Sequence, residues 1–355
     1  MAKLKICVLI AGFGIGGAQK QCIYLLNELQ NDPELELHLI HYYEGINFDL
    51  LKQENLKIHQ LAVSSFYNPK NIINLVKLIK GIGPDILFSW LHASDVYSYF
   101  ISKFVSKMKW IMTERDSFYP FDLRYKLRGF AGKGADLIIC NSVKGKAYWE
   151  QKGVKSGKVA VVKNILLPAV KKKTLELGGS PVITYAGRLE VQKNVITLAN
   201  AFCVLADKHK AAKFMIIGEG ILDGQLQEII KAEGKEDNVS LISYQKNILA
   251  YFSATDVFVN ISAHEGMPNT IIENILLGNK IVASKIPEHE EILGAAYPYY
   301  VNDPHNINEV AGAIERILTE NNIEDHLAYG RTQLEQMSAE KVGNAYKKLF
   351  KQTLN

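Results

Sequence analysis

The sequence predicts an α/β protein with two consecutive domains, each built on a doubly wound parallel sheet. Three observations favour this fold class. The chain has 355 residues, which is long for one ordinary domain and suits two. Short apolar runs typical of buried strands alternate with longer amphipathic stretches typical of helices, as in βαβ units. This alternation is interrupted once, by a segment rich in lysine, glycine and proline, and then resumes.

The first half of the chain contains the elements of one such domain. Its apolar runs are short, which predicts strands rather than helices. The predicted strands cover residues 5–11, 35–43, 86–90, 110–113, 137–141 and 159–163. Amphipathic stretches between them predict helices over residues 18–29, 72–80, 96–104 and 143–151. Because strands and helices alternate, the strands are expected to pair in parallel.

Residues 168–173 and 178–181 predict a linker, because proline, glycine and clustered lysine all disfavour a packed element. Beyond it, strands are predicted over residues 182–186, 214–218, 239–242, 257–261 and 280–283. Helices are predicted over residues 195–207, 222–233, 247–252, 270–277, 306–319 and 339–349. We therefore expect an N-terminal domain at 1–165 and a C-terminal domain at 166–338. A last helix, over about residues 339–355, is expected to pack back onto the first domain.

The composition is that of a globular enzyme, with 48% hydrophobic and 22% charged residues, which excludes a disordered or collagen-like protein. No apolar run approaches the ~18 residues that span a bilayer. The first apolar run leads into a glycine-rich turn rather than a cleavage site, so we expect a cytoplasmic protein. The four cysteines lack metal-ligand spacing and are expected to be buried, reduced thiols.

Charge is distributed unevenly. Residues 1–173 carry 25 Lys and Arg against 14 Asp and Glu, a net charge of +11, whereas residues 174–355 carry 16 against 23, a net charge of −7. Most of the positive excess lies in residues 103–163, with 14 basic and 5 acidic residues. This excess predicts attraction to an anionic membrane surface or a phosphorylated acceptor. An ordinary solvated surface remains the alternative, and no nucleic-acid motif accompanies the charge. The oligomeric state is not indicated.

The first candidate site is the glycine-rich segment at residues 12–17, which follows the first strand and opens a helix. It satisfies the pattern GxGxxG, and free amides at a helix start suit a phosphate. A dinucleotide site also needs an acidic residue at the end of the second strand, whereas Glu44 lies beyond that strand. A nicotinamide site, a structural turn and another phosphate ligand therefore all remain open.

The second candidate site is the pair Arg188 and Lys193, directly after the first strand of the second half. At a strand-to-helix turn both cations can point toward the carboxyl end of the strand, where open α/β sheets bind ligands. An arginine fork and a lysine point charge together suit a diphosphate. Two solvated surface cations are the alternative.

The third candidate site is the segment at residues 262–274, in which Glu265 and Glu273 form a Glu-x7-Glu pattern. Glu265 is expected on a loop and Glu273 in the first turns of a helix, so the two can contact different parts of one extended ligand. The amides of residues 267–270 lie at the start of that helix and suit phosphate. Taken alone, two such carboxylates are more typical of helix capping and surface charge than of a binding site.

In combination, these segments resemble the retaining glycosyltransferases of family 4, which have the GT-B fold, and in particular bacterial members of the cell-envelope polysaccharide type. The resemblance covers nearly the whole chain. It is carried by Gly16-Gly17-Ala18, by residues 134–142, 161–164 and 216–220, by Gly187-Arg188 with Lys193-Asn194, and by the Glu-x7-Glu segment. Each motif is weak alone, and the combination is specific.

The resemblance implies roles for individual residues. Arg188 and Lys193 are expected to hold the donor diphosphate, Glu273 the nucleotide ribose, and Glu265 the transferred sugar. His92 is similar to a histidine near the donor sugar in many relatives, although a lone histidine is often structural. The predicted catalytic set is Glu265, Arg188, Lys193 and His92. The other predicted donor-binding residues are Gly16, Gly17, Gly218, Ser243, Gly266, Met267, Pro268, Asn269, Thr270 and Glu273.

Two features of the sequence need separate mention. Gln19 stands where many relatives carry glutamate. Glu114 and Arg115 resemble a Glu-Arg pair of polysaccharide-assembly members. These two side chains are expected either to contact the acceptor or to pair with each other.

The implied enzyme is a retaining hexosyl- or N-acetylhexosaminyltransferase that uses a UDP-sugar. Its expected acceptor is a lipid-linked saccharide or another cell-envelope glycan, met at the cytoplasmic face of the membrane. No Asp-x-Asp motif occurs in the sequence, so we expect neither metal nor cofactor. The alternatives are an NAD-dependent oxidoreductase, a sugar-nucleotide epimerase on the same fold, and a non-catalytic sensor that binds a sugar nucleotide.

Overall fold

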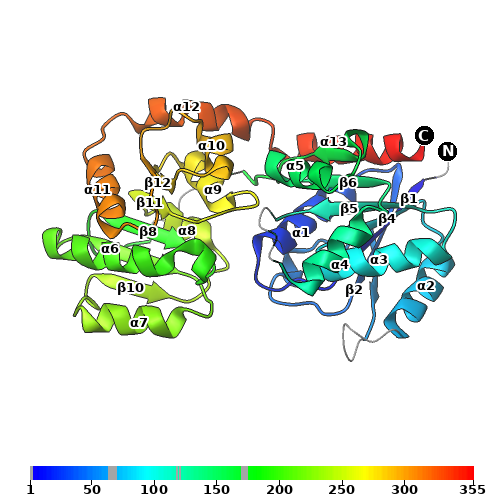
Figure 1. Ribbon diagram of the computed structural model, residues 1–355, viewed down its shortest axis with the longest axis horizontal. Helices are drawn as coiled ribbons and strands as arrows, with labels where there is room; N and C mark the ends of the chain where they lie inside the picture. Colours follow the sequence, from blue (N-terminus) through cyan, green and yellow to red (C-terminus); the bar gives the residue numbers. More distant parts are fainter. Residues whose placement is uncertain (1–2, 63–69, 117–118, 120, 169–174) are drawn as a thin grey trace. The chain divides into compact units, whose positions relative to one another are not determined.

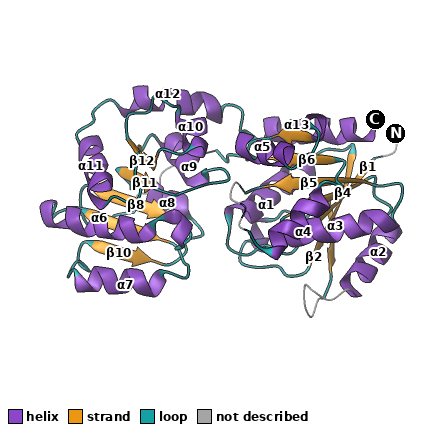
Figure 2. Ribbon diagram, in the orientation of Figure 1, coloured by secondary structure: helices purple, strands orange, loops and turns teal. Residues whose placement is uncertain are grey.

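The computed structural model describes residues 3–62, 70–116, 119, 121–168 and 175–355 (Figures 1 and 2). The chain divides into two compact units. Unit 1 comprises residues 1–165 and 336–355, and unit 2 comprises residues 166–335. Of the predicted linker at 168–173, all but Pro168 lies outside the described residues, and residues 178–181 form bends before the first strand of unit 2.

In the described part of unit 1, seven parallel strands form one sheet in the order β3-β2-β1-β4-β5-β6-β7. The strands are β1 (Leu4–Ile10), β2 (Leu35–His41), β3 (Leu56–Gln60), β4 (Ile86–Trp90), β5 (Lys109–Glu114), β6 (Leu137–Cys140) and β7 (Val159–Val161). The central strands are covered on both faces, which explains why they are continuous apolar runs in the sequence. The predicted parallel sheet is confirmed.

Helices cover both faces of this sheet (Figure 1). The helices are α1 (Gly17–Leu29), α2 (Lys70–Ile82), α3 (His92–Phe104), α4 (Leu123–Gly132), α5 (Val143–Gln151) and α13 (Ala339–Leu354). Alternate residues of β1 enter two separate cores, because successive side chains of a strand point to opposite faces. Ile6 and Val8 pack with α1 and α13, whereas Cys7 and Leu9 pack with the layer of α2 to α5. All four cysteines are buried and free.

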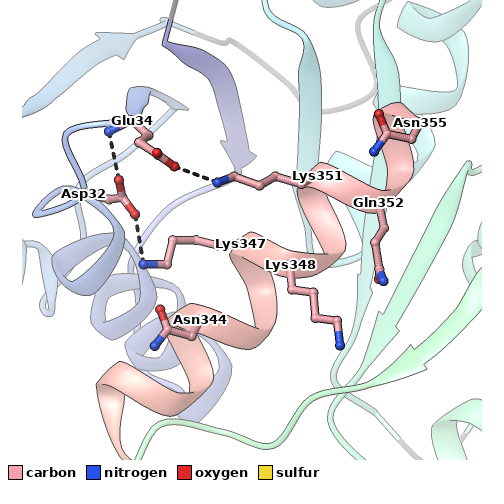
Figure 3. A pocket seen from close by; sticks show the side chains of 8 residues that line it. All are labelled: Asp32, Glu34, Asn344, Lys347, Lys348, Lys351, Gln352 and Asn355. Atoms are coloured by element: carbon pink, nitrogen blue, oxygen red, sulfur yellow. Dashed lines mark hydrogen bonds and ion pairs between the residues drawn. The ribbon is translucent and has the colours of Figure 1, made fainter. Parts of the chain in front are cut away.

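The last helix, α13, belongs to unit 1 and packs against α1. Tyr346 and Phe350 of α13 are buried in the same core as α1 and β1. Figure 3 shows two ion pairs that flank this contact: Lys347 lies 2.9 Å from Asp32, and Lys351 lies 2.6 Å from Glu34. Both ends of the described chain therefore belong to unit 1.

Unit 2 is a second α/β unit, with a sheet of six parallel strands among its described residues, in the order β10-β9-β8-β11-β12-β13. The strands are β8 (Val182–Ala186), β9 (Lys213–Ile217), β10 (Val239–Ile242), β11 (Val257–Asn260), β12 (Lys280–Ser284) and β13 (Tyr300–Val301). The helices are α6 (Val195–Lys208), α7 (Asp223–Ala232), α8 (Ile248–Phe252), α9 (Asn269–Leu277), α10 (Pro287–Leu293), α11 (Ile307–Leu318) and α12 (Ile323–Leu334).

Each sheet has a point at which the strand order reverses. In unit 1, β2 and β3 extend the sheet on one side of β1 and β4 pairs on the other, so the reversal lies between β1 and β4. In unit 2 the same reversal lies between β8 and β11. Ligands of open α/β sheets bind at the carboxyl ends of the strands at such a point. Within the described residues, no helix has the length and apolarity to cross a membrane.

Candidate functional site

The loop that follows β8 places the two predicted cations at the reversal point of unit 2. Arg188 lies two residues beyond the end of β8 and forms an ion pair with Glu190 at 2.7 Å, with 49% of its side chain exposed. Lys193 ends a short 3-10 turn before α6, and only 13% of its side chain is exposed. Arg188 is therefore at the surface of the site, whereas Lys193 lies inside it.

Glycines allow the loops after β8 and β9 to pack backbone against backbone. Gly218 follows β9 with a φ of +150°, and a Cβ at this position would lie 1.9 Å from the carbonyl oxygen of Gly187. Beside it, the amide of Leu189 donates to the carbonyl of Glu219 at 3.0 Å. Any larger residue would separate the loops. Gly218 thus supports the backbone that carries Arg188.

The loop after β11 brings Glu265 directly to Lys193. The Nζ of Lys193 lies 2.5 Å from the Oε1 of Glu265, and the Ser262 hydroxyl donates to the same oxygen at 2.7 Å. The amide of Ala263 also donates to the carbonyl of Gln192 at 2.9 Å, which joins the two loops through their backbones. Two residues that lie 72 positions apart are thus held as one buried ion pair.

Glu265 is held in its ionised form despite its burial. Burial raises the pKa of the Glu265 carboxyl, but the Lys193 ammonium and the hydrogen bonds around it outweigh that effect, so the pKa lies below its ordinary value. His289 lies nearby, fully buried, and its Nδ1 donates to the carbonyl of Ser284 at 2.8 Å. A lysine ammonium carries three hydrogens, so Lys193 can pair with Glu265 and still donate to a phosphate.

Helix α9 follows this loop and carries Glu273 in its second turn. Pro268 precedes the helix and gives no side-chain cap, and the amide of Asn269 donates to the carbonyl of Met267 at 2.9 Å. Asn269 and Thr270, in the first turn, are partly exposed, and Met267 is buried. Glu273 is partly exposed. The loop that carries Glu265 therefore leads directly into the amino end of α9, as the sequence predicts.

The two remaining donor-binding candidates of unit 2 lie on neighbouring loops. Gly266 follows Glu265 and is partly exposed, and Ser243 follows β10 and is exposed. The amide of Tyr244 donates to the side chain of Glu219 at 3.3 Å, which connects the loop after β10 with the loop after β9. The predicted residues of unit 2 thus all lie at the carboxyl edge of its sheet or in the first turns of α9.

In unit 1 the glycine loop follows β1, at the reversal point of that sheet. Gly17 is the first residue of α1 and Gly16 precedes it. The side-chain amide of Asn47 donates to the carbonyl of Gly14 at 2.7 Å and braces the loop from the segment after β2. Trp90, at the end of β4, donates from its indole nitrogen to the carbonyl of Ala18 at 2.9 Å. The end of β4 and the start of α1 are therefore joined.

The end of β2 does not fit a dinucleotide site. The strand ends at His41, which is buried and contacts the rings of Phe13 and Phe48 at centroid distances of 6.0 Å and 5.0 Å. Glu44 lies three residues beyond the strand and is exposed. The strand end thus lacks the acidic residue that would bind a ribose hydroxyl. This geometry does not support the NAD-dependent oxidoreductase.

His92 is the first residue of α3, directly after β4. Leu91 before it has a φ of +73°, a conformation that leucine rarely adopts and that concentrates at functional sites. The Nε2 of His92 is buried and has no hydrogen-bond partner among the described residues. Burial, followed by the positive charge of Arg128, lowers the pKa of His92 to about 4. A neutral imidazole with an unused nitrogen at the carboxyl edge of the sheet is compatible with ligand contact.

Glu114 and Arg115 do not pair with each other, which corrects one of the two expectations. Glu114 is fully buried, and its Oε2 accepts from Arg128 at 2.6 Å and from the Trp149 indole at 2.9 Å. Arg115 turns to other partners: its guanidinium lies 4.2 Å from the Trp90 ring centroid and donates to Asn164 at 3.0 Å. Contact of Glu114 or Arg115 with the acceptor stays a prediction.

Sequence reasoning missed several residues that shape these loops. Asn194 has a φ of +52°, and its side-chain amide donates to the carbonyl of Ile261 at 2.8 Å. Its place after Lys193 was a usable signal, because asparagine tolerates the left-handed conformation better than most residues. Ser262 lies in the predicted segment at residues 262–274, although its bond to Glu265 was not predicted. His289 had no such signal, because nothing in the sequence relates its segment to Glu265.

A family model described as Glycosyl transferases group 1 matches residues 168–333. The chain is a glycosyltransferase. The matched segment is nearly the whole of unit 2, including the loops that carry Arg188, Lys193 and Glu265. An uncharacterized glycosyltransferase of Methanocaldococcus jannaschii is 31% identical over 189 residues, which is 47% of this chain and about half, 46%, of the archaeal protein.

Two bacterial relatives align with more of this glycosyltransferase. The lipopolysaccharide core biosynthesis glycosyltransferase LpsE of Rhizobium meliloti is 23% identical and covers 94% of this chain and 96% of its own. An N-acetylgalactosaminyltransferase of Campylobacter jejuni, named for a diphospho-undecaprenol saccharide, is 24% identical and covers 79% of this chain and 80% of its own. The predicted resemblance to cell-envelope glycosyltransferases is therefore confirmed.

The fold of the glycosyltransferase is also that of solved relatives. A crystal structure of Anabaena HepE in complex with UDP and glucose superposes with a TM-score of 0.83 at 16% identity, and the match covers 98% of this chain and 100% of that one. The GT-B fold is therefore confirmed. Among the described residues, no group of three or more His, Cys, Asp or Glu side chains is placed to hold a metal ion.

Proposed function

We propose that this glycosyltransferase is a retaining, metal-independent enzyme that moves a hexosyl or N-acetylhexosaminyl group from a UDP-sugar to a lipid-linked saccharide or another cell-envelope glycan. The observation that carries the donor site is the buried ion pair between Lys193 and Glu265 at the reversal point of unit 2. Arg188 lies on the same edge of the sheet. We assign unit 2 to the donor and unit 1 to the acceptor.

The side chains of the site suit the departure of a nucleoside diphosphate. When the bond between the sugar and the diphosphate breaks, negative charge develops on the leaving phosphate, and Arg188, Lys193 and the positive end of the α9 helix dipole can stabilise it. The sugar becomes oxocarbenium-like, and Glu265 lies on the loop expected to face it. The leaving phosphate accepts the proton of the acceptor hydroxyl, and the new bond forms on the face from which the phosphate departs.

The names of similar proteins support the donor and the acceptor. The Anabaena structure contains UDP and glucose, which supports a UDP-sugar donor. The Campylobacter relative is named for a diphospho-undecaprenol acceptor, which supports a lipid-linked saccharide. Such an acceptor lies in a membrane, so we place the enzyme at the cytoplasmic face of the membrane as a peripheral protein. The excess of positive charge in residues 103–163 favours the same location.

A thermal-shift screen tests the proposed donor class. Nucleoside diphosphates and their sugars would be compared with NAD, because a ligand at 100 times its Kd stabilises a protein by about 2.7 kcal/mol. We expect UDP and at least one UDP-sugar to raise the melting temperature. Stabilisation by NAD without stabilisation by any nucleoside diphosphate would contradict the proposal. With the donor known, the anomeric configuration of the product, read by NMR, tests retention.

Removal of divalent metal is expected to leave transfer intact. The positive charge of Arg188 and Lys193 does the work that a metal ion does in other transferases, and the sequence contains no Asp-x-Asp motif. The initial rate of UDP release from the donor would be measured with and without excess EDTA. Complete loss of the rate with EDTA, restored by added Mg²⁺ or Mn²⁺, would show that the reaction needs a metal.

Substitution of Glu273 and of Glu265 is expected to change different measured quantities. Glu273→Gln should weaken free UDP and the UDP-sugar alike, because Glu273 is assigned to the ribose hydroxyls. Glu265→Gln should leave UDP affinity nearly unchanged and lower kcat, because its interaction strengthens only as the sugar gains charge. Calorimetric titration with UDP, together with steady-state kinetics, separates the two effects.

A matched control is available on α11, where Glu315 pairs with Lys208 at 2.9 Å, away from the carboxyl-edge loops. Glu315→Gln should change neither UDP affinity nor kcat. Since Glu265 also holds Lys193, the melting temperature of each variant must be compared with that of the wild type. Equal loss of UDP affinity in Glu265→Gln and Glu273→Gln would refute the division of roles.

A further inference from the structure

We propose that the outer faces of α3 and α4 form a membrane-docking surface, whose apolar side chains insert into an anionic bilayer while its lysines bind the lipid headgroups. The inference deepens the proposed function and rests on it, because a lipid-linked acceptor brings the enzyme to a membrane. Figure 1 shows α3 and α4 side by side on one face of unit 1. We call this the α3–α4 surface.

Helix α4 is amphipathic in the opposite sense from an ordinary surface helix. Its buried face is formed by Arg128, Gly129, Ala131 and Gly132. Its outer face carries Leu123, Leu127 and Phe130, which are 69%, 48% and 64% exposed and recur every three or four residues. The helix thus turns a charge and small residues inward and large apolar groups outward, which suits an apolar environment outside the protein.

The apolar surface continues onto α3. Phe100 and Phe104, one turn apart, are 43% and 60% exposed. Tyr99 connects the two helices, because its ring lies 5.4 Å from Phe100 and 5.5 Å from Phe130 between centroids. Phe121, just before α4, is 91% exposed. A soluble monomer exposes single apolar residues commonly, but a contiguous cluster of this kind marks an interaction site.

The charged groups around this cluster are positive. Lys103 lies 4.8 Å from the Tyr99 ring centroid, and Lys126 lies 3.8 Å from that of Phe121. The exposed cations of the surface and its edge are Lys103, Lys107, Arg124, Lys126 and Lys133. Helix α4 contains no acidic residue, the one acid of α3 is fully buried, and Asp122 at the start of α4 pairs with Arg124.

This charge pattern selects a bilayer over a second copy of the chain. In a symmetric dimer the same patch meets itself, so these cations would face one another and repel. An anionic lipid surface instead offers both an apolar interior and negative headgroups. Aromatic rings with lysines beside them are the groups that lie at such an interface. Anionic vesicles are therefore the expected partner.

Vesicle flotation tests the surface with matched variants. Vesicles of phosphatidylglycerol mixed with phosphatidylcholine are compared with phosphatidylcholine alone. The double substitution Leu127→Ser and Phe130→Ser should weaken binding at least about tenfold. Each of Lys103→Gln, Lys126→Gln and Lys133→Gln should weaken it about fivefold, and this effect should fade as salt rises. Controls on the opposite helix layer, Leu354→Ser and Lys348→Gln, should bind as the wild type does.

Insertion, as opposed to charge attraction alone, can be read by fluorescence. The three native tryptophans, Trp90, Trp110 and Trp149, are all buried. Leu127→Trp therefore adds a single exposed reporter, whose emission should shift to the blue on anionic vesicles and be quenched by brominated lipid. Leu354→Trp on α13 is the control and should show neither change. An unshifted emission from Leu127→Trp on bound protein would overturn insertion at this surface.

The outcomes separate this inference from the proposed function. Wild type that binds UDP but not anionic vesicles would overturn the α3–α4 surface and leave the donor assignment intact. Wild type that binds vesicles through this surface but no nucleoside diphosphate would overturn the proposed function alone. A dimer that becomes monomeric in the Leu127→Ser and Phe130→Ser variant, without vesicle binding by the wild type, would show that a second copy is the partner.

Discussion

Arg188→Ala is expected to lower the rate of glycosyl transfer by about 100- to 1000-fold, because removing one preformed donor to a developing oxyanion costs about 2.7–4 kcal/mol in the transition state. The protein should remain folded. Arg188 is half-exposed, and its ion pair with Glu190 is of the surface kind that contributes less than about 1 kcal/mol. The measurement is the initial rate of UDP release from the donor found in the thermal-shift screen, with the melting temperature of the variant beside it.

A matched control for this prediction is Lys208→Ala. Lys208 also forms a surface ion pair in unit 2, with Glu315 at 2.9 Å, but it lies at the end of α6 rather than on a carboxyl-edge loop. Removing it should leave the rate unchanged. If Arg188→Ala retained nearly the wild-type rate, the assignment of Arg188 to the diphosphate would be wrong.

Lys193 requires a different design, which the sequence alone did not indicate. The sequence treats Arg188 and Lys193 as equivalent cations, whereas the structure pairs Lys193 with a buried carboxylate. Lys193→Ala would leave Glu265 buried without its partner, and breaking such a pair destabilises a protein by about 3–5 kcal/mol. A loss of rate in this variant would therefore combine unfolding with chemistry. Arg188 gives the cleaner test.

The sequence predicted the parallel sheets because their central strands are buried on both faces and show as apolar runs. It missed β3 (Leu56–Gln60), an edge strand in which polar residues separate the apolar ones, and β13, which has two residues. It also missed α10 and α12, which are short or weakly amphipathic. These elements depend on packing against neighbours that no local pattern reveals.

Helix α4 was missed for a more informative reason. Its large apolar residues face solvent, and its buried face consists of an arginine, an alanine and two glycines. Sequence-based prediction expects the apolar residues of a helix to face the core, and the apolar residues of α4 do not. Its two glycines also lower the helix propensity of the segment. The inverted pattern is itself the signal of the α3–α4 surface, but it can be recognised only once the burial of Arg128 is known.

For the candidate site, the sequence predicted which loops carry the functional residues, but not which side chains those residues contact. The rule that ligands bind at the carboxyl ends of strands placed Arg188, Lys193 and Glu265 on loops that lie next to each other in unit 2. The pairing of Glu114 could not be predicted, because its partner Arg128 lies on the unpredicted helix α4. An arginine in a basic segment is ordinarily exposed, and only the tertiary structure shows that this one is buried.

The second large effect is expected in unit 1, where Arg128→Met should lower the free energy of unfolding by about 3–5 kcal/mol at neutral pH. Arg128 is buried between two carboxylates: its Nε lies 2.7 Å from Asp95, and its second guanidinium nitrogen lies 2.6 Å from Glu114. Without the guanidinium, both carboxylates remain buried with no cation between them. Urea unfolding followed by tryptophan fluorescence measures the loss, because all three tryptophans are in unit 1.

Arg124→Met is the control for this experiment. Arg124 lies on the same helix, is largely exposed, and pairs with Asp122 at 2.9 Å on the surface. Its removal should cost less than about 1 kcal/mol. Arg128→Lys should fall between the two, because it keeps the charge but loses the planar fork that reaches Asp95, Glu114 and the carbonyl of Thr113 at once.

The pH dependence of the Arg128→Met variant distinguishes lost charge from lost packing. Burial raises the pKa of Asp95 to about 6 in the wild type, and Arg128 opposes that rise. Without Arg128 the folded-state pKa of Asp95 should lie higher still. A carboxyl with a raised folded pKa contributes stability that is present at low pH and is lost as pH rises through that pKa. The deficit relative to the wild type should therefore be larger at about pH 8 than at about pH 5. A deficit of the same size at both pH values would mean that Arg128 stabilises unit 1 by filling space, and the buried charge network would have no part in holding α4 against the sheet.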